Sequence, residues 1–544
     1  MNFDIDCLLI GNNDTDFNEY VKQVRKMGDD SGAHHDLRSN YIYIDNKAYN
    51  AKQVYNYYDE KKVDLSEVFS ATNAYLGTYL HKHGLTFDYI NAYQDDKSKL
   101  KKLLLNKKIG LVAITTTLYV SVFPIMEIMK FIKEYNPDVK VIVGGPFVTT
   151  QAKTLDKDSL MYLLKMIGAD FFINSSQGEW ALVSVLKAMK KNTSYDEIHN
   201  LFYKRDEDYI FTEIMEEDNR LSENMVKWEL FTDIGQYLNL RTSISCPFSC
   251  SFCAFPEHAG KYQIVSVEDI EKELDAIEAK KTVKSVFFVD DTLNVPGERF
   301  KELLRMMIRK KYSFNWYSHY RCQFTDEETA QLMKESGCEG VFLGIESGSD
   351  KILSYMNKKA TTEQYRKGIS LLKKYGITMQ ASFIIGFPGE TEDTIKETIN
   401  FIKTTEIDYY RVQLWYCDTT TRIYREGRER FGITGSQFEW NHTMDTKTAT
   451  QYMNDITLQI TDKIRIPNYF DIDAVIRLKH NGVDKQSIDE FLKIFHECVQ
   501  DKLLYGDENI TAERERQFRA FFYRDVMNGM KENSELTDVL DFDF

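Results

Sequence analysis

Three cysteines lie close together near the middle of the chain, in the segment Cys246-Pro-Phe-Ser-Cys250-Ser-Phe-Cys253. Thiolates are soft ligands, and three of them in one short loop suit a zinc ion or an iron–sulfur cluster. A cubane 4Fe–4S cluster held by three thiolates leaves one iron free to bind another molecule. In the alternative, His258 completes a structural Cys3His zinc site. The cluster is the favoured interpretation, and the spacing alone leaves the zinc site open.

The segment around this loop alternates between strands and helices. Apolar runs of strand length occur at 238–244, 283–289, 314–319, 340–345, 379–385 and 409–416. Helix-length amphipathic stretches fill most of the gaps between them. Six strand–helix units in succession predict a partial (β/α)6 barrel, whose active site lies at the C-terminal ends of the strands. The cysteine loop follows the first of these strands, where such a barrel places its chemistry.

A second α/β unit precedes the barrel. Apolar runs at 3–10, 87–90, 109–114, 139–143 and 169–173 alternate with helical stretches and predict a doubly wound parallel sheet. A long insertion interrupts the first crossover, and it contains a Tyr-rich stretch at 40–58 and a predicted helix around 65–81. The charged, weakly periodic stretch after this unit suits a linker. We therefore expect an α/β fold divided into a doubly wound domain (1–195), a linker (196–234), the partial barrel (235–435) and a mostly helical C-terminal region or lid (436–544).

Composition excludes several classes of protein. The 544 residues carry a formal net charge of −15, which argues against a protein that coats nucleic acid or binds anionic membranes. No apolar run approaches the roughly 18 residues that span a bilayer. The start of the chain lacks a cationic segment followed by an apolar one, and eight cysteines in so long a chain do not form a disulfide scaffold. We expect a cytoplasmic protein with no nucleic-acid or membrane partner.

One further feature lies within the cysteine loop and three motifs follow it in order, and with them residues 235–420 resemble the radical S-adenosylmethionine (SAM) superfamily. An aromatic residue precedes the third cysteine, an acidic pair follows the second strand, Gly344-Ile-Glu-Ser-Gly348 follows the fourth, and Gly386-Phe-Pro-Gly-Glu390 follows the fifth. The resemblance implies a 4Fe–4S cluster on Cys246, Cys250 and Cys253. It implies SAM contacts from Phe252, Asp291, Arg321, Glu346, Ser347, Gly386 and Gln413. For Arg321 and Gln413, a structural role is the alternative. Ser245 departs from the family pattern, in which glycine is common at that place.

The first domain resembles the cobalamin-binding module of B12-dependent radical SAM enzymes. Its matching segments are Thr115-Thr-Thr-Leu118 after the third strand, Gly144-Gly-Pro-Phe-Val-Thr149 after the fourth, and Ser176-Gln-Gly-Glu179 at the last helix. The resemblance implies cobalamin contacts from Thr115, Thr116, Leu118, Gly144, Gly145, Thr149, Gly178 and Glu179. No Asp-x-His-x-x-Gly motif occurs in the chain, so we expect no lower histidine ligand to cobalt. The alternative is a vestigial domain that binds nothing.

Together the two parts resemble cobalamin-dependent radical SAM methyltransferases, including those of the phosphinothricin pathway. The resemblance implies methyl transfer from methylcobalamin to an unactivated carbon or a phosphinate phosphorus of a natural product or peptide, with a 5′-deoxyadenosyl radical. It also implies an electron donor such as flavodoxin or ferredoxin, and no catalytic side chain is assigned. A B12-dependent radical SAM enzyme that rearranges or cyclises its substrate without methylation is the near alternative. A cobalamin- or zinc-binding sensor is the distant one.

Overall fold

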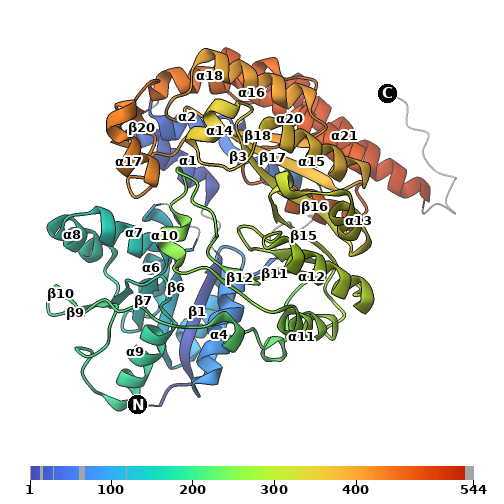
Figure 1. Cartoon of the computed structure of the whole chain (residues 1–544). Helices are drawn as coiled ribbons and strands as arrows, with labels where there is room; N and C mark the ends of the chain where they lie inside the picture. Colours follow the sequence, from blue (N-terminus) through green and yellow to red (C-terminus); the bar gives the residue numbers. More distant parts are fainter. Residues whose placement is uncertain are drawn as a thin grey trace, which may run out of the picture.

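The computed structural model of the chain describes residues 2–12, 16–28, 30–59, 68–117, 119 and 121–532. Two large sheets organise it, one of seven strands and one of eight. Figure 1 shows the smaller sheet and its helices below and to the left, with the larger sheet curving above and to the right. The expected α/β fold class is therefore confirmed. Within the described residues, no helix is long and apolar enough to cross a membrane.

Five parallel strands form the centre of the first sheet, in the order β8-β7-β6-β1-β5. Their bounds are β1 (Ile5–Asn12), β5 (Phe87–Ala92), β6 (Ile109–Thr115), β7 (Lys140–Gly144) and β8 (Phe171–Ile173). One face packs on α4 (Ala71–Lys82) and α9 (Glu179–Lys191), and the other packs on α5 (Lys97–Asn106), α6 (Phe123–Tyr135) and α8 (Lys157–Ile167). Helices on both faces explain why these strands read as continuous apolar runs.

Part of the expected linker at 196–234 is strand. β9 (Leu201–Arg205) and β10 (Asp208–Phe211) form an antiparallel hairpin that extends the first sheet beside β8. The turn places Asp206 at φ 55°, a conformation that aspartate tolerates better than most residues. Leu201, Phe202 and Tyr209 are buried, while the charged side chains of the hairpin are exposed. The charge of this segment therefore marks a solvated sheet edge.

The second sheet contains the six predicted barrel strands in sequential order, all parallel. They are β11 (Tyr237–Leu240), β14 (Ser285–Phe288), β15 (Asn315–Tyr320), β16 (Cys338–Glu346), β17 (Thr378–Ile385) and β18 (Tyr409–Leu414). The outer helices are α11 (Val267–Glu278), α12 (Gly297–Lys310), α13 (Glu327–Glu335), α14 (Asp350–Tyr355), α15 (Thr362–Lys374), α16 (Glu392–Thr404) and α17 (Arg422–Phe431). Two short strands from elsewhere in the chain pair at the sheet edges, β4 (Val68–Phe69) and β21 (Ile464–Arg465).

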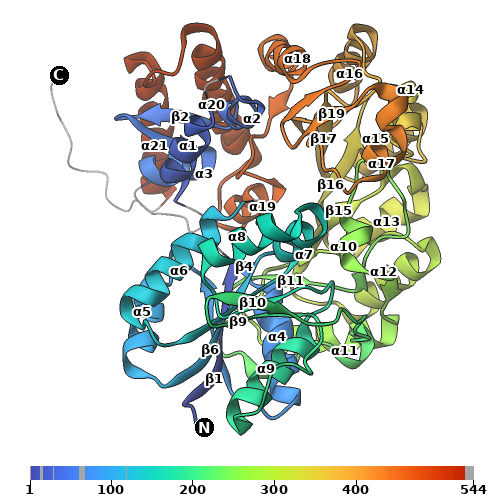
Figure 2. The ribbon, with the colours of Figure 1, turned by 90° about the vertical axis from the view of Figure 1, so that its left-hand side faces the viewer.

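The insertion in the first crossover packs far from the first sheet. Its elements are α1 (Phe17–Lys26), α2 (Gly32–Arg38), β2 (Tyr41–Ile44), β3 (Lys47–Asn50) and α3 (Ala51–Tyr58). They lie beside α18 (Thr446–Gln459), α20 (Lys485–Tyr505) and α21 (Ala512–Glu532), as both views show (Figure 2). The domain expected over 1–195 therefore includes a segment, 17–58, that belongs to the C-terminal layer.

Buried polar contacts fix this insertion to the barrel and the C-terminal helices. Asp36 Oδ1 accepts a hydrogen bond from Leu414 N, at the end of β18, at 2.8 Å. Lys502 Nζ donates to the Tyr41 carbonyl at 2.5 Å and lies 3.5 Å from the centroid of the Tyr41 ring. Charges buried in this way are stabilising only when they are paired. These contacts explain why the insertion packs here, and single-chain periodicity gives no sign of them.

Candidate active site

The cysteine loop lies between the short strand β12 (Ser243–Ile244) and helix α10 (Phe255–Ala259). All three thiols are free of disulfides. Cys246 Sγ lies 3.4 Å from Thr292 Oγ1, and Arg321 Nη2 donates to Cys250 Sγ at 3.1 Å. Burial raises the pKa of Cys253 to about 12, and the neighbouring Cys250 adds to the effect. A buried thiol such as Cys253 ionises when a bound metal centre supplies positive charge, which fits an iron cluster in this loop.

Asp290 holds the base of this loop. Its fully buried carboxylate accepts hydrogen bonds from Thr242 N at 2.9 Å, Thr242 Oγ1 at 2.8 Å, Ser243 N at 2.5 Å and Ser243 Oγ at 2.6 Å. Two residues further on, Ser245 has φ 66°, the left-handed region that glycine adopts without strain. Four hydrogen bonds to one carboxylate thus fix the backbone just before the first cysteine.

Below this loop, the inward face of the barrel strands is not fully covered by protein. Along the strands, the inward-facing side chains Asn239, Phe287, His319 and Phe342 keep partial solvent exposure. Their outward-facing neighbours, such as Leu238, Phe288 and Val341, are fully buried against the helices. The lower end is closed, because Tyr317 packs on Ile472 and Ile476 of α19 (Ile472–His480). The interior is therefore a cup that opens toward the cysteine loop.

Glu346 and Lys358 form a buried ion pair at the rim of this cup. Lys358 Nζ lies 3.0 Å from Glu346 Oε1 and 5.4 Å from the centroid of the Phe252 ring. Phe252 is half-buried, with its ring centroid 6.4 Å from that of Phe387. Two of the residues that the sequence assigns to SAM, Phe252 and Glu346, therefore meet around one lysine. No sequence motif points to Lys358, which follows α14.

Asp291 and Arg321 lie on either side of the cysteine loop. Asp291 is exposed to the barrel mouth, and partial burial together with the charge of Asp290 raises its pKa to about 7. Arg321 is buried, with its guanidinium 3.6 Å from the centroid of the Phe248 ring. Its hydrogen bond to Cys250 favours a structural role for Arg321 in the cysteine loop over direct contact with SAM. Asp291 is the freer of the two to receive a ligand.

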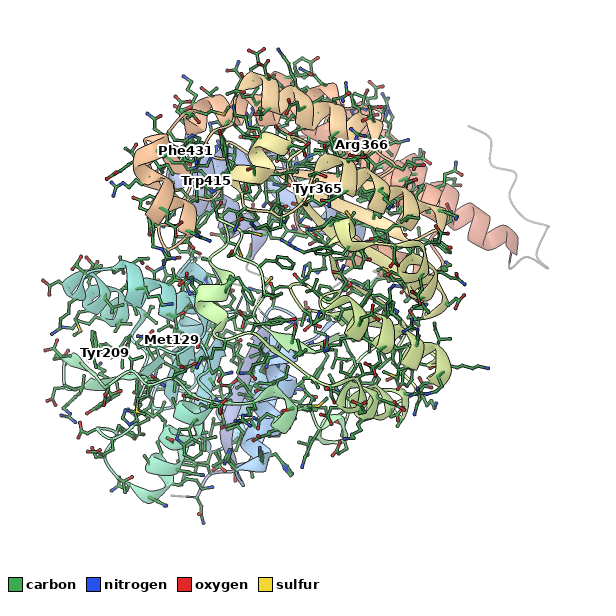
Figure 3. The ribbon with its side chains drawn as sticks, viewed as in Figure 1. Met129, Tyr209, Tyr365, Arg366, Trp415 and Phe431 are labelled. Carbon is green, nitrogen blue, oxygen red and sulfur yellow. The ribbon has the colours of Figure 1, made fainter. Side chains whose placement is uncertain are left out.

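The backbone of the Gly386–Glu390 motif after β17 is fixed by hydrogen bonds to Glu390 and His442. Gly386 has φ 86°; its N–H donates to Glu390 Oε2 at 2.6 Å, and its carbonyl lies 2.8 Å from His442 Nε2. His442 stacks on Trp440, which packs on Trp415, labelled in Figure 3. A Cβ at Gly386 would meet the Trp440 ring at 2.4 Å, so only glycine fits here. The loop backbone at this strand end is therefore rigid.

Ser347 and Gln413 differ in their surroundings. Ser347 is fully buried: its Oγ accepts from Ser349 N at 3.1 Å and lies 3.3 Å from Thr398 Oγ1. It stabilises the turn after β16 and does not reach the cup. Gln413 lies on β18 in register with Ile384, is partly exposed, and remains a candidate for contact with a ligand.

The candidate cobalamin residues lie along the C-terminal edge of the first sheet. Thr116 is buried: its Oγ1 donates to the Gly144 carbonyl at 2.9 Å and accepts from Phe147 N at 3.3 Å. Gly145 has φ 111°, and a Cβ there would meet Thr116 Oγ1 at 2.8 Å. Thr149 is buried and donates to the Pro146 carbonyl at 3.0 Å. These contacts build a tight turn that presents glycine backbone to the edge.

The remaining cobalamin candidates differ from one another in their contacts. Thr115 Oγ1 donates to the Ile10 carbonyl at 3.3 Å, and Gly178 packs so closely on Ile173 that a Cβ would lie 2.5 Å from it. Glu179 is buried and accepts from Asn219 Nδ2 at 2.9 Å; burial raises its pKa, which the charge of Arg241 partly offsets. Leu118 lies outside the described residues.

The two candidate sites face each other. Helix α10, directly after the cysteine loop, contacts α7 (Pro146–Thr154), directly after the Gly144-Gly145 turn. Lys153 Nζ donates to the Glu257 carbonyl at 3.0 Å across this contact. In Figure 1, α10 lies beside α7, to its right, where the two parts of the molecule meet. The C-terminal ends of both sets of parallel strands are therefore directed into one region.

The zinc alternative requires four ligands on one ion. Among the described residues, no three His, Cys, Asp or Glu side chains gather around a single metal position. In a cubane, each thiolate binds a different iron, so the three cysteines of a cluster site need not gather around one metal position. His258 lies on α10, half-buried, and its Nδ1 has no hydrogen-bond partner. The alternative that His258 completes a zinc site finds no support in this geometry.

Two family models match the chain. Residues 240–402 match the radical SAM superfamily, and residues 67–163 match the B12 binding domain. The first match runs from the end of β11 into α16 of the barrel, and the second includes β5, β6 and β7 of the first sheet. They include the cysteine loop, the motif after β17 and the Gly144-Gly145 turn, whereas Gly178, Glu179 and Gln413 lie outside them.

Two curated relatives match more than half of the chain. An uncharacterized methyltransferase of Pyrococcus horikoshii is 28% identical over 309 residues, 55% of this chain and 65% of that protein. The anaerobic magnesium-protoporphyrin IX monomethyl ester cyclase of Rubrivivax gelatinosus is 25% identical over 347 residues, 60% of each protein. The chain thus spans less than two thirds of the length of these relatives.

Solved structures share the fold over most of the chain. The radical SAM methyltransferase TsrM from Kitasatospora setae, with cobalamin and a 4Fe–4S cluster bound, superposes with a TM-score of 0.56 and 16% identity over 86% of this chain and 97% of that one. The cobalamin-dependent radical SAM enzyme OxsB, with aqua-cobalamin and SAM bound, gives a TM-score of 0.56 and 14% identity over 98% and 82%. At these identities the likeness establishes the fold.

Proposed function

We propose that this chain, a cobalamin-dependent radical SAM enzyme with a B12-binding domain, a radical SAM domain and the cofactors cobalamin, SAM and a 4Fe–4S cluster, is a methyltransferase. The observation that carries the proposal is the contact between α10 and α7, because it directs the cysteine loop and the Gly144-Gly145 turn into one region. Radical methyl transfer needs both cofactors near one substrate. When bound, the cluster supplies the electron that cleaves SAM and cobalamin supplies the methyl group.

The chain's own residues are proposed to bind and position the cluster and SAM. Cys246, Cys250 and Cys253 are the proposed cluster ligands, and Asp290 fixes their loop. Asp291, Glu346 and the rigid backbone at Gly386 are proposed to receive SAM at the rim of the cup, with Lys358 holding Glu346 in place. The closed lower end of the barrel excludes bulk water, and this exclusion protects a reactive radical from side reactions.

The proposed substrate is a small molecule or peptide with an unactivated carbon or a phosphinate phosphorus as methyl acceptor. The names of the Pyrococcus relative and of TsrM, both methyltransferases, support methylation, and a TsrM structure with tryptophan bound supports a small substrate. We propose a flavodoxin or ferredoxin as electron donor. The cyclase relative favours a second candidate, a cyclisation or rearrangement without methyl transfer.

Anaerobic turnover separates the two candidates. The purified chain, reconstituted with iron, sulfide and cobalamin, is reduced and given SAM together with extracts of candidate metabolites. A methyltransferase forms S-adenosylhomocysteine and adds one labelled methyl group from methyl-labelled SAM to a product. Formation of 5′-deoxyadenosine with an unlabelled product establishes the second candidate. No consumption of SAM in any condition contradicts both.

A further inference from the structure

The cup of the barrel contains two polar atoms that no protein group satisfies. Asn239 Oδ1 and His319 Nδ1 are both shielded from solvent and lack a hydrogen-bond partner. Buried polar groups are almost always paired, because leaving one unpaired costs about 1–3 kcal/mol. Two such atoms on the inward face of one barrel therefore indicate a ligand that satisfies them.

Strand register places these atoms in two successive layers of the barrel, because Phe287 is in register with Tyr317, two residues before His319. Asn239 on β11 is in register with Phe287 on β14, and His319 on β15 is in register with Phe342 on β16. The ring centroids of Phe287 and Phe342 lie 5.2 Å and 5.4 Å from that of His319. Both contacts are edge-on, so the three rings form a continuous apolar wall with the imidazole at its centre.

This wall has a floor and an open side. Beneath it, Tyr317 stacks on Phe287 at 4.6 Å between centroids and packs on α19. Above it, two residues along the same strand, Arg321 contacts the cysteine loop. Asn239, Phe287, His319 and Phe342 all keep partial solvent exposure, so protein atoms do not cover the wall completely.

The chemistry of the unpaired atoms defines the ligand. The Asn239 oxygen is an acceptor only. Burial lowers the pKa of His319, so the imidazole is neutral and one of its nitrogens also accepts. Aromatic walls bind flat, apolar groups. Two acceptors beside such a wall fit a planar ring that carries an N–H or O–H group.

We propose that Asn239, Phe287, His319 and Phe342 form the substrate subsite of the barrel, and that it takes a planar ring with an N–H or O–H donor. The role of substrate rests on the proposed function, whereas binding itself does not. Arg411 on β18, with its guanidinium 5.9 Å from the centroid of the Phe342 ring, is paired with Asp471 through Nη2, and its buried Nε is a further unpaired donor beside the wall.

Fluorine NMR on the full-length, reconstituted protein tests the subsite with two probes. 5-Fluoroindole has the ring N–H, and 5-fluoro-1-methylindole lacks it. We expect the first to bind at least ten-fold more tightly than the second. His319→Leu reduces this preference to less than two-fold, His319→Asn retains part of it, and Asn239→Leu weakens it independently. His199→Ala, at an exposed histidine, leaves it unchanged.

Each result decides the proposal. Equal binding of the two probes to the wild type, no binding of either, or an unchanged preference in both leucine variants overturns it. Iron content and SAM affinity, measured on the same variants, verify that the fold is intact. SAM cleavage is scored separately, since a wild-type protein that binds 5-fluoroindole selectively but never cleaves SAM contradicts the proposed function and leaves the subsite standing.

Discussion

Lys358 Nζ lies 3.0 Å from Glu346 Oε1, and only 7% and 12% of these side chains are exposed. Lys358→Met leaves the Glu346 carboxylate buried without its partner, which destabilises the barrel by about 3 kcal/mol. We expect SAM affinity to fall at least ten-fold, because the carboxylate loses its orientation. Urea unfolding and SAM titration by calorimetry measure the two effects.

Two further variants interpret that result. Lys358→Met combined with Glu346→Gln recovers part of the stability, because the unpaired charge is gone. Lys396→Met removes a lysine from the exposed pair with Glu392 and has little measurable effect. Equal losses in Lys358→Met and Lys396→Met contradict the role assigned to the buried pair.

Cys250→Ala removes one of the three expected cluster ligands. Iron content after anaerobic reconstitution falls from about four per chain to background, and broad absorption near 400 nm disappears. Reductive cleavage of SAM is lost with it. Cys498→Ala, in the core of the C-terminal helices, serves as the control and retains its iron. Iron binding that survives Cys250→Ala excludes the three-thiolate cluster.

Ser245→Gly relieves backbone strain at the start of the cysteine loop. Ser245 has φ 66°, where a Cβ costs about 1 kcal/mol that glycine avoids. Amide hydrogen exchange in residues 243–253 slows about five-fold, because local opening becomes harder by that amount. Ser245→Ala keeps the Cβ and leaves the exchange rates unchanged. Faster amide exchange in Ser245→Gly than in the wild type contradicts the proposed backbone strain at Ser245.

Glu390 makes stability depend on pH in a predictable direction. Burial raises its pKa from the ordinary 4.5 to about 8, although its Oε2 accepts from Gly386 N and Phe387 N. The folded protein therefore holds an extra proton between pH 4.5 and about 8, and stability falls as pH rises through that window, by up to about 1 kcal/mol per pH unit.

Glu390→Gln tests this dependence because the amide oxygen still accepts both hydrogen bonds and no longer titrates. We expect its denaturation midpoint to change less than that of the wild type between pH 5 and pH 8. Glu392→Gln changes an exposed carboxylate two residues away and keeps the wild-type slope. Identical slopes in the wild type and Glu390→Gln show that Glu390 is not the group responsible.

Strand–helix alternation predicted both sheets, because each βα unit is encoded locally. All six barrel strands and the five central strands of the first sheet lie where the apolar runs place them. The path of residues 17–58 was not predictable, since it depends on contacts such as Asp36 with Leu414, which are hundreds of residues apart in sequence. The hairpin at 201–211 was hidden by its charged, exposed side chains.

The residues of the candidate site also divide into those that local sequence motifs predict and those that only the fold reveals. The cysteine spacing and the glycine motifs are local signals, and the structure brings Cys246, Cys250, Phe252 and Glu346 to one barrel mouth. Lys358 and His319 carry no motif. His319 was within reach of the alternation along its strand, which places it on the inward face with Tyr317, but only the neighbouring strands show that its Nδ1 lacks a partner.

The packing of β2 and α3 against α20 and α21 imposes an order on biosynthesis. The helices that bury Ile42, Val54 and Tyr55 are translated more than four hundred residues after these side chains. This cluster therefore closes only after α20 and α21 have been made, and not when the first sheet is complete.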